Sequence, residues 1–386
     1  MAVAAFAAAG CLKTLDESLI DQTGGGGGGG GAGGSGGVGG TGGGSGGGGG
    51  TSGGGGGAAG GGGSAGYVGY DPQKFPVTKL WAGTPPIVLS ADETDVYFTI
   101  GDLADSPLRK LPIAGGPAQD LTPLLERPRA LVAPSTSSYV FVAGGRNSGV
   151  QGSLVRTAKA GGAKDEISIT GKSPLGARGL FAATDGFAYV TFDASTSNVV
   201  GLARFGLSAG VQAGAAIFSV TEGETGGAVV ASGACVYWIS NGALWVMPTG
   251  GGTRESALSA PISDAAGLAA DAANFYYTRS EGSVWSRSLS GTACDGIGAA
   301  EKQLASGFTK IGPVIRFKSS PTIAWSAIGD ETQSYAGGGV FTVAAGGGVV
   351  TQIAPKESGP SALADSPYDV VYATSTGELR KVPKPK

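Results

Sequence analysis

The 386-residue chain contains no histidine. Without an imidazole it cannot form a Ser-His-Asp or Cys-His catalytic group, and it cannot bind a metal ion through histidine. Catalysis by Asp and Glu carboxylates needs neither an imidazole nor a histidine-bound metal ion. The absence therefore favours a protein that is not an enzyme, while carboxylate chemistry stays open.

Charge is also scarce. Only 14% of the residues are charged and the net charge is −3, whereas ordinary soluble domains have about 25% charged residues. No basic stripe is present, so we expect no nucleic-acid partner. Gly171-Lys172-Ser173 matches the end of a phosphate-binding loop, but Glu166 occupies the position of its first glycine. We expect neither a cofactor nor a bound metal.

Long apolar runs are missing as well, since none approaches the roughly 20 residues of a membrane-spanning helix. What the chain has in excess is glycine. Of its 76 glycines, 32 lie in the 43 positions from Gly24 to Gly66. Glycine has no side chain to bury and loses the most backbone entropy on folding. We therefore predict a disordered polar and glycine-rich linker over residues 12–66.

The first eleven residues, MAVAAFAAAGC, are apolar and end in Ala8-Ala9-Gly10-Cys11. This segment resembles the signal peptide and lipobox of bacterial lipoproteins. The resemblance implies lipidation at Cys11 and a membrane anchor in the bacterial cell envelope, at the outer membrane, the cell surface or the periplasm. Ala8 stands where the family usually has leucine, and no Lys or Arg precedes the apolar run, which fits a translation start upstream of Met1. The alternative is a short N-terminal helix with a buried cysteine.

Residues 67–386 contain an internal repeat whose landmark is an apolar, mostly aromatic triplet. The middle residues of successive triplets are 44, 48, 48, 39, 48 and 48 positions apart, which is the period of a propeller blade. The seven triplets are Val96-Tyr97-Phe98, Val140-Phe141-Val142, Ala188-Tyr189-Val190, Val236-Tyr237-Trp238, Phe275-Tyr276-Tyr277, Ile323-Ala324-Trp325 and Val371-Tyr372-Ala373.

Each unit has four short β-type segments separated by glycine-rich turns, which predicts an antiparallel four-stranded sheet. The last unit has only three segments, and an unassigned one, Val77–Gly83, precedes the first unit. We therefore predict an all-β, seven-bladed β-propeller closed by an N-terminal strand. A six-bladed propeller and a pair of β-sandwiches are the alternatives.

Triplets such as Val236-Tyr237-Trp238, followed by a G-x-L-x-x-x-Pro segment and a Gly-Gly turn, resemble the repeats of YWTD-type and TolB-like propellers. They are also similar to those of uncharacterised propeller lipoproteins of myxobacteria. The Thr-Asp that follows Tyr-Trp in the YWTD type is absent here, and these families often have six blades. The resemblance implies a fold and a location in the cell envelope, but no particular activity.

Candidate ligand contacts are the charged and polar residues of loops between strands. They are Arg146, Asn147, Asp193, Glu222, Glu224, Asp330 and Glu331. The innermost strands are expected to be almost free of charge, with Arg316 as the exception. Four aspartates, Asp92, Asp185, Asp271 and Asp365, recur shortly before the triplets. A calcium ring is conceivable, but we favour capping of turns, because Asp readily bonds to backbone N–H groups two residues on.

Besides Cys11, the chain has Cys235 and Cys294. In a propeller they fall on one face, in neighbouring blades, where a disulfide is geometrically feasible and an envelope location would permit it. The alternative is a buried thiol at Cys235, which precedes an apolar triplet.

Two functions remain open. The first is a monomeric, membrane-tethered binding or scaffold module for a protein, peptide or glycan. The second is a propeller enzyme, either a lyase or a glycan hydrolase, with two carboxylates at the mouth of the central channel.

Overall fold

The computed structural model describes residues 67–386 except for short segments. These segments are 102–105, 126, 145–153, 171–173, 184–185, 195–198, 209–212, 221–225, 241–242, 257–264, 290–293, 295–300, 330–337 and 356–358. All secondary-structure elements within the described residues are β-strands. None of the described segments forms a helix long and apolar enough to cross a membrane. The predicted leader, Cys11 and the glycine-rich linker lie outside the described residues.

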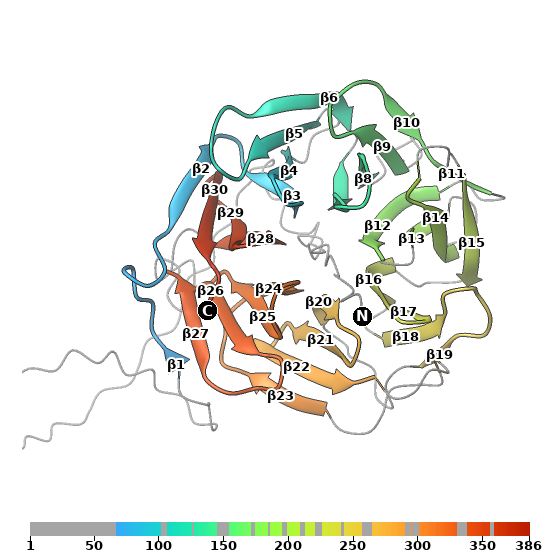
Figure 1. Ribbon diagram of the computed structural model, residues 1–386. Helices are drawn as coiled ribbons and strands as arrows, with labels where there is room; N and C mark the ends of the chain where they lie inside the picture. The colour runs from blue at the N-terminus through green and yellow to red at the C-terminus, as the bar shows by residue number, and fades with distance from the viewer. Residues whose placement is uncertain are drawn as a thin grey trace, which may run out of the picture. The chain divides into compact units, whose positions relative to one another are not determined.

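Seven sheets, each built on four antiparallel strands, are arranged around a ring (Figure 1). Blades 1 to 3 run outwards from the centre in chain order. Blade 1 contains β3 (Pro86–Ala91), β4 (Asp95–Ile100), β5 (Ser106–Pro112) and β6 (Gln119–Leu125); blade 2 contains β7 (Pro128–Val132), β8 (Tyr139–Gly144), β9 (Leu154–Ala158) and β10 (Lys164–Glu166); blade 3 contains β12 (Pro174–Ala182), β13 (Phe187–Ala194), β14 (Val199–Gly206) and β15 (Ala213–Val220).

Blades 4 to 6 follow the same order, and blade 7 takes its outermost strand from the N-terminal side of the chain. Blade 4 contains β16 (Gly226–Ser232), β17 (Cys235–Ser240), β18 (Ala243–Pro248) and β19 (Glu255–Ser256); blade 5 contains β20 (Ala265–Ala270), β21 (Asn274–Arg279), β22 (Ser283–Ser288) and β23 (Glu301–Ala305); blade 6 contains β24 (Ile311–Arg316), β25 (Thr322–Ala327), β26 (Gly339–Ala344) and β27 (Val350–Ala354); blade 7 contains β28 (Pro360–Asp365), β29 (Asp369–Thr374), β30 (Glu378–Pro383) and β2 (Thr78–Ala82).

The repeated triplets form the second strand of each blade, and the packing explains why three apolar residues stand in a row. In β4, Val96 and Phe98 pack with residues of blade 7, whereas Tyr97, between them, packs with residues of blade 2. Successive side chains of a strand point to opposite faces of the sheet. Because both faces of a blade are covered by neighbouring blades, the strand cannot show the alternation of a half-exposed sheet.

The ring closes where β2 pairs in antiparallel register with β30, with Thr78 opposite Lys381 and Lys79 opposite Arg380. Figure 1 shows this junction between the blue N-terminal strand and the red C-terminal strands. The predicted seven blades and the N-terminal closing strand are confirmed. The six-bladed and β-sandwich alternatives are wrong.

Two additional strands were not predicted. β1 (Tyr67–Val68) lies parallel to β27 at the outer edge of blade 6, and β11 (Ser168–Thr170) lies parallel to β15 at the outer edge of blade 3. Both are too short to show a periodic pattern in the sequence. Each covers an otherwise open strand edge, which removes a place where another chain could pair.

Every innermost strand also has a register shift against the second strand. At two of these shifts a glycine lies where the neighbouring blade approaches closely. A Cβ on Gly179 would lie 2.2 Å from the Gly227 carbonyl oxygen, and one on Gly267 would lie 2.9 Å from the Val314 nitrogen. Larger side chains at these positions would push adjacent blades apart.

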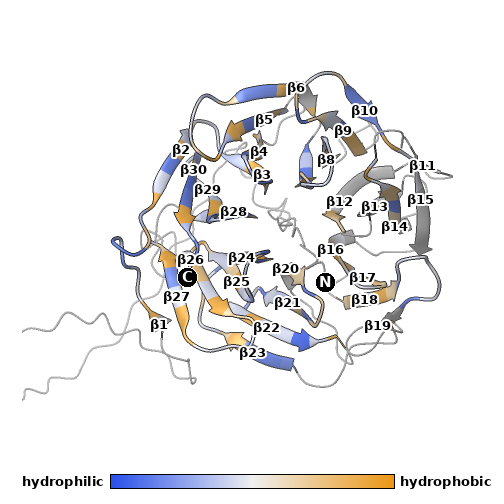
Figure 2. Cartoon of the chain, viewed as in Figure 1, coloured by the Kyte–Doolittle hydropathy of each residue, from blue (hydrophilic) through white to orange (hydrophobic). Residues whose placement is uncertain are grey.

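Polar residues gather on the outer strands, such as β6 and β10, as Figure 2 shows. The innermost strands are poor in charge but less so than expected. Besides Arg316, they contain Arg129 in β7, Arg178 in β12 and Asp365 in β28. The expectation that Arg316 is the single charged residue of the innermost strands is therefore wrong. The strands extend beyond the apolar runs that mark them in the sequence, and the added residues include charged ones.

The N-terminal segment should contribute to the stability of the ring. Phe75, only 3% exposed, packs with Ile315, Leu363 and Tyr372 of blades 6 and 7. We expect Phe75→Ala to lower the free energy of unfolding by about 3 kcal/mol, because it leaves a cavity in this core. Urea denaturation of the full chain measures the change.

Val68→Ala is the matched control, since Val68 is 51% exposed. Its effect should stay within about 0.5 kcal/mol. Equal stabilities of the Phe75 variant and the wild type would show that the segment before β2 is not part of the folded unit.

Candidate functional site

Most of the candidate ligand residues cannot be placed. Arg146, Asn147, Glu222, Glu224, Asp330 and Glu331 lie outside the described residues. Asp193 lies in β13, where its backbone pairs with Gly176 and Val200, and nothing is described of its side chain. The site chemistry that the structure does describe lies mainly on the face that carries the turns between first and second strands and between third and fourth strands. We call this the turn face, and the opposite one the loop face.

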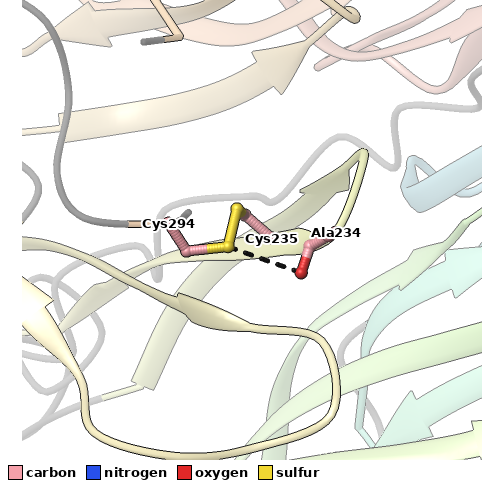
Figure 3. The surroundings of a disulfide bond; sticks show 3 residues. All are labelled: Ala234, Cys235 and Cys294. Atoms are coloured by element: carbon pink, nitrogen blue, oxygen red, sulfur yellow. Dashed lines mark hydrogen bonds between the residues drawn. A yellow bond between two sulfur atoms is a disulfide. The ribbon is translucent and has the colours of Figure 1, made fainter. Parts of the chain in front are cut away.

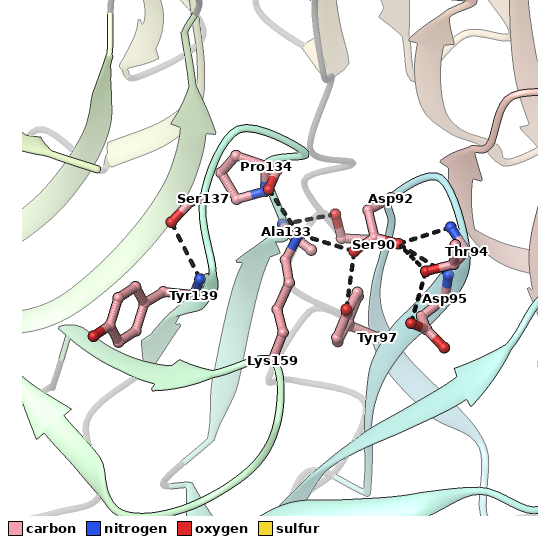
Figure 4. Close-up of polar contacts among 10 residues, drawn as sticks. All are labelled: Ser90, Asp92, Thr94, Asp95, Tyr97, Ala133, Pro134, Ser137, Tyr139 and Lys159. Carbon is pink, nitrogen blue, oxygen red and sulfur yellow. Dashed lines mark hydrogen bonds and ion pairs between the residues drawn. The ribbon is translucent and has the colours of Figure 1, made fainter. Parts of the chain in front are cut away.

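Asp92 occupies the first of these turns and is buried (Figure 4). Its Oδ1 accepts hydrogen bonds from the backbone N–H groups of Thr94 and Asp95, at 3.0 and 2.9 Å. Its Oδ2 accepts a hydrogen bond from the Tyr97 hydroxyl at 2.9 Å and lies 2.8 Å from Lys159 Nζ. Lys159 follows β9 in blade 2, so the carboxylate both caps its own turn and binds the next blade.

Asp271 repeats the arrangement in blade 5. Its Oδ1 accepts hydrogen bonds from the N–H groups of Ala273 and Asn274, both at 2.8 Å. Its Oδ2 accepts one from the Tyr276 hydroxyl at 2.8 Å and one from Arg316 Nε at 3.3 Å. Arg316 belongs to blade 6. The charge noticed on an innermost strand is therefore the partner of an aspartate in the neighbouring blade.

The surroundings of these two carboxylates hold them ionised. Burial by itself raises the pKa of Asp92, but hydrogen bonds from Lys159, Thr94 and Asp95 outweigh it, so the pKa is lowered. Burial likewise raises the pKa of Asp271, and the backbone N–H of Ala273, the Tyr276 hydroxyl and Arg316 lower it overall. Neither group can deliver a proton near neutral pH, so neither is suited to be a general acid.

The fourth aspartate departs from the pattern. In blade 7 the turn is capped by Ser366, whose Oγ accepts a hydrogen bond from the Asp369 N–H at 3.1 Å. Asp365, one residue earlier, accepts the Lys318 N–H at 3.0 Å and faces Lys384. Turn capping is thus found at Asp92 and Asp271, is wrong for Asp365, and cannot be assessed at Asp185, which is not described. In the described part of the chain, no cluster of three or more Asp, Glu or Cys side chains could hold a metal ion.

Cys235 and Cys294 are joined by a disulfide between blades 4 and 5, with their Cα atoms 5.5 Å apart (Figure 3). Cys235 begins β17, and Cys294 lies between β22 and β23. The bond therefore joins the turn between the first and second strands of blade 4 to the turn between the third and fourth strands of blade 5. The contact of Asp92 with Lys159 joins blades 1 and 2 in the same way.

A polar or covalent contact on the turn face joins each blade to the next, and we call these contacts the inter-blade clasps. In ring order they are Asp92–Lys159, Ser137 Oγ to the Leu207 carbonyl, Arg204 Nη1 to the Thr249 carbonyl, Cys235–Cys294, Asp271–Arg316, the Lys318 N–H to Asp365, and Lys381 Nζ to the Ile113 carbonyl. Their chemistry differs from junction to junction, so the sequence repeat does not reveal them.

A further cluster lies in blade 5. The Arg279 guanidinium is 3.2 Å from Glu301 and 3.9 Å from Glu281, and it stacks over the Trp285 ring with 4.6 Å to the centroid. The Tyr277 hydroxyl donates a hydrogen bond to Glu301 at 2.5 Å. Glu301 begins the outermost strand of the blade. Both carboxylates are thus bound to one arginine, and Glu301 lies at the periphery of the ring. They do not form the free pair at the channel mouth that carboxylate catalysis requires.

Comparison with known proteins agrees with this architecture. No family model matches the chain, and no curated protein matches it. Solved structures do match. These likenesses show the fold, a β-propeller.

Three of the similar structures come from different proteins. One is a catalytically inactive histidine-to-alanine variant of virginiamycin B lyase from Staphylococcus aureus, solved with quinupristin, with TM-score 0.56, 10% identity, and 81% of this chain and 100% of that chain covered. The WD40 domain of Neurospora crassa Pan2 has TM-score 0.55, 9% identity and coverage of 82% and 98%. The propeller domain of Myceliophteria thermophila Cps50 (Swd1) has TM-score 0.57, 11% identity and coverage of 80% and 99%.

The clasp at Asp92 should stabilise the fold in a pH-dependent way. Lys159→Met leaves a largely buried carboxylate without its cation, and we expect a loss of about 2 kcal/mol at neutral pH. Because the pKa of Asp92 in the folded protein lies below the ordinary value of an aspartate, the contribution of this contact is complete above that ordinary value and is lost as the pH falls through the folded pKa. The difference between variant and wild type should shrink over the same range in urea titrations.

Asp120→Asn serves as the control, because the Arg109–Asp120 pair is largely exposed. We expect a change below about 1 kcal/mol. A Lys159 variant as stable as the wild type at neutral pH would show that the contact only accompanies the packing of blades 1 and 2.

The disulfide clasp can be tested separately. The two cysteines are 59 residues apart, and we expect the double variant Cys235→Ser/Cys294→Ser to lose about 2–4 kcal/mol of stability, since the cross-link restricts the unfolded chain. The unreduced, unlipidated and denatured wild-type chain should expose one thiol, that of Cys11. Three thiols before reduction would contradict the bond.

Proposed function

We propose that this protein is a membrane-tethered lipoprotein of the bacterial cell envelope whose propeller is a binding or scaffold module for a protein, peptide or glycan. The observation that carries the proposal is the complete set of inter-blade clasps on a closed ring. A ring held at each junction keeps the ends of its strands in a fixed arrangement. Such preorganisation lowers the entropic cost of binding a partner.

The tether rests on the sequence before the propeller. Ala8-Ala9-Gly10-Cys11 supplies the lipidation signal, and the 43-residue glycine-rich tract that follows would span roughly 35–40 Å as a flexible coil. That reach would hold a folded domain clear of a membrane surface. The disulfide between Cys235 and Cys294 supports an oxidising compartment, because such bonds rarely persist in the cytosol.

The alternative is a propeller enzyme, and the structural likeness to a lyase is the reason to consider it. That lyase was made inactive by replacing a histidine, and this chain has no histidine. The carboxylates Asp92, Asp271 and Glu301 are each bound to a cation. None of these three is therefore a free catalytic carboxylate, so the binding module has more support.

Expression of the full chain in a lipoprotein-processing bacterium tests the tether. We expect the wild type in the membrane fraction, with a mature N-terminus at an acylated Cys11 by mass spectrometry, and Cys11→Ser in the soluble fraction. Cys235→Ser is the matched control, because it removes a cysteine without touching the lipidation signal, and it should remain with the membrane. An unmodified Met1 on membrane-associated protein would refute lipidation at Cys11.

The soluble Cys11→Ser chain then separates the two functions. Incubated with peptidoglycan fragments and neutral glycans, a binding module retains one of them unchanged, whereas a lyase or hydrolase releases cleaved products. Product formation would refute the binding-module proposal in favour of the enzyme.

A further inference from the structure

Two buried ionisable side chains meet near the C-terminus. The side chain of Lys384 is 6% exposed and that of Asp365 is 3% exposed, and Lys384 Nζ lies 2.7 Å from Asp365 Oδ1. Asp365 ends the innermost strand β28, whereas Lys384 follows β30, the third strand of the same blade. The contact therefore joins the end of the chain to the centre of blade 7.

The two groups are in direct contact, since Lys384 Nζ lies 2.7 Å from Asp365 Oδ1. Oδ1 is buried and receives no hydrogen bond of acceptable geometry, despite its short distance from Nζ. Oδ2, by contrast, accepts the Lys318 backbone N–H at 3.0 Å. This donor is placed where an oxyanion would develop if the carboxyl carbon were attacked.

The other contacts of Lys384 hold its amine in place. Nζ lies 3.4 Å from both the Ser319 hydroxyl and the Pro367 carbonyl oxygen, and 4.9 Å from the centre of the Phe317 ring. The Lys384 N–H donates to the Tyr368 carbonyl at 2.9 Å, which fixes the backbone. Groups held at contact distance react with a large effective concentration.

Burial also moves both groups towards the protonation states that can react. It raises the pKa of Asp365 despite the neighbouring Lys384 and Lys318. It lowers the pKa of Lys384, with Lys318 adding to the effect and Asp365 and Asp369 opposing it. A neutral amine is the nucleophilic form of lysine, and a protonated carboxyl can lose water.

We propose that Lys384 and Asp365 condense to an intramolecular isopeptide bond. The Nζ lone pair attacks Cγ of the protonated carboxyl, and negative charge on Oδ2 is stabilised by the Lys318 N–H. One amine proton passes to Oδ1, which already carries the carboxyl proton and leaves as water when the C–O bond breaks. The products are a secondary amide and one water molecule, and no oxidant or other reactant is needed.

The bond would replace two buried ionisable groups by one neutral amide, which cannot become charged inside the blade. It would also fix the C-terminal residues covalently to the innermost strand of the closing blade. This proposal is independent of the proposed function, because it concerns blade 7 alone.

The test is mass spectrometry of the intact, reduced and denatured full chain. We expect a mass lower by one water than the sequence requires, and the full sequence mass for both Lys384→Arg and Asp365→Ala. Lys381→Arg is the matched control, because Lys381 lies 3.5 Å from Asp369 in the same blade but is more exposed. It should retain the dehydrated mass.

Tryptic digestion locates the bond. Cleavage after Lys356, Arg380 and Lys381 should give a branched product that joins residues 357–380 to residues 382–386. Unmodified mass in the wild type would overturn the proposal. Dehydrated protein without the branched peptide would overturn it too, since Asp365-Ser366 can lose water as a cyclic imide. The wild-type measurement stands even if the variants fail to fold.

Discussion

The pairing of β2 with β30 is the constraint on which the other features of the propeller depend. A four-stranded blade is covered on both faces only if it has a neighbour on each side, so an open ring would expose the apolar second strands of its two end blades. The last blade takes its outermost strand from the N-terminal segment, and this joins the two ends of the repeat through backbone hydrogen bonds. Closure therefore makes blade 7 depend on a strand about 300 positions away in the sequence.

Within the closed ring, the two faces have different physical roles. On the turn face, charged side chains such as Asp92, Lys159, Asp271 and Arg316 bind one another across junctions. Their carboxylates are ionised and have their partners within the chain, so this face offers little to a ligand.

The blades could be predicted from the sequence because the apolar segments that form their strands recur periodically. The triplets of apolar residues mark strands covered on both faces, and the unpaired segment Val77–Gly83 is visible because one unit is incomplete. β1 and β11 could not be foreseen, since two or three residues carry no period and their pairing is decided by the edge beside them. The register shifts were missed for a similar reason, because close approach of blades, as at Gly179, is a tertiary effect.

The candidate site was less predictable than the fold, and the aspartates show why. Asp92 and Asp271 stand at equivalent positions and cap equivalent turns, so local reasoning about Asp in turns applies to both. Asp365 is the last residue of its innermost strand and lies one residue before the capping position, so Ser366 caps the turn and the Asp365 carboxyl faces Lys384. A displacement of one residue along a strand reverses the direction of the side chain. Spacing alone therefore cannot distinguish a turn cap from a buried reactive pair, although the two differ completely in chemistry.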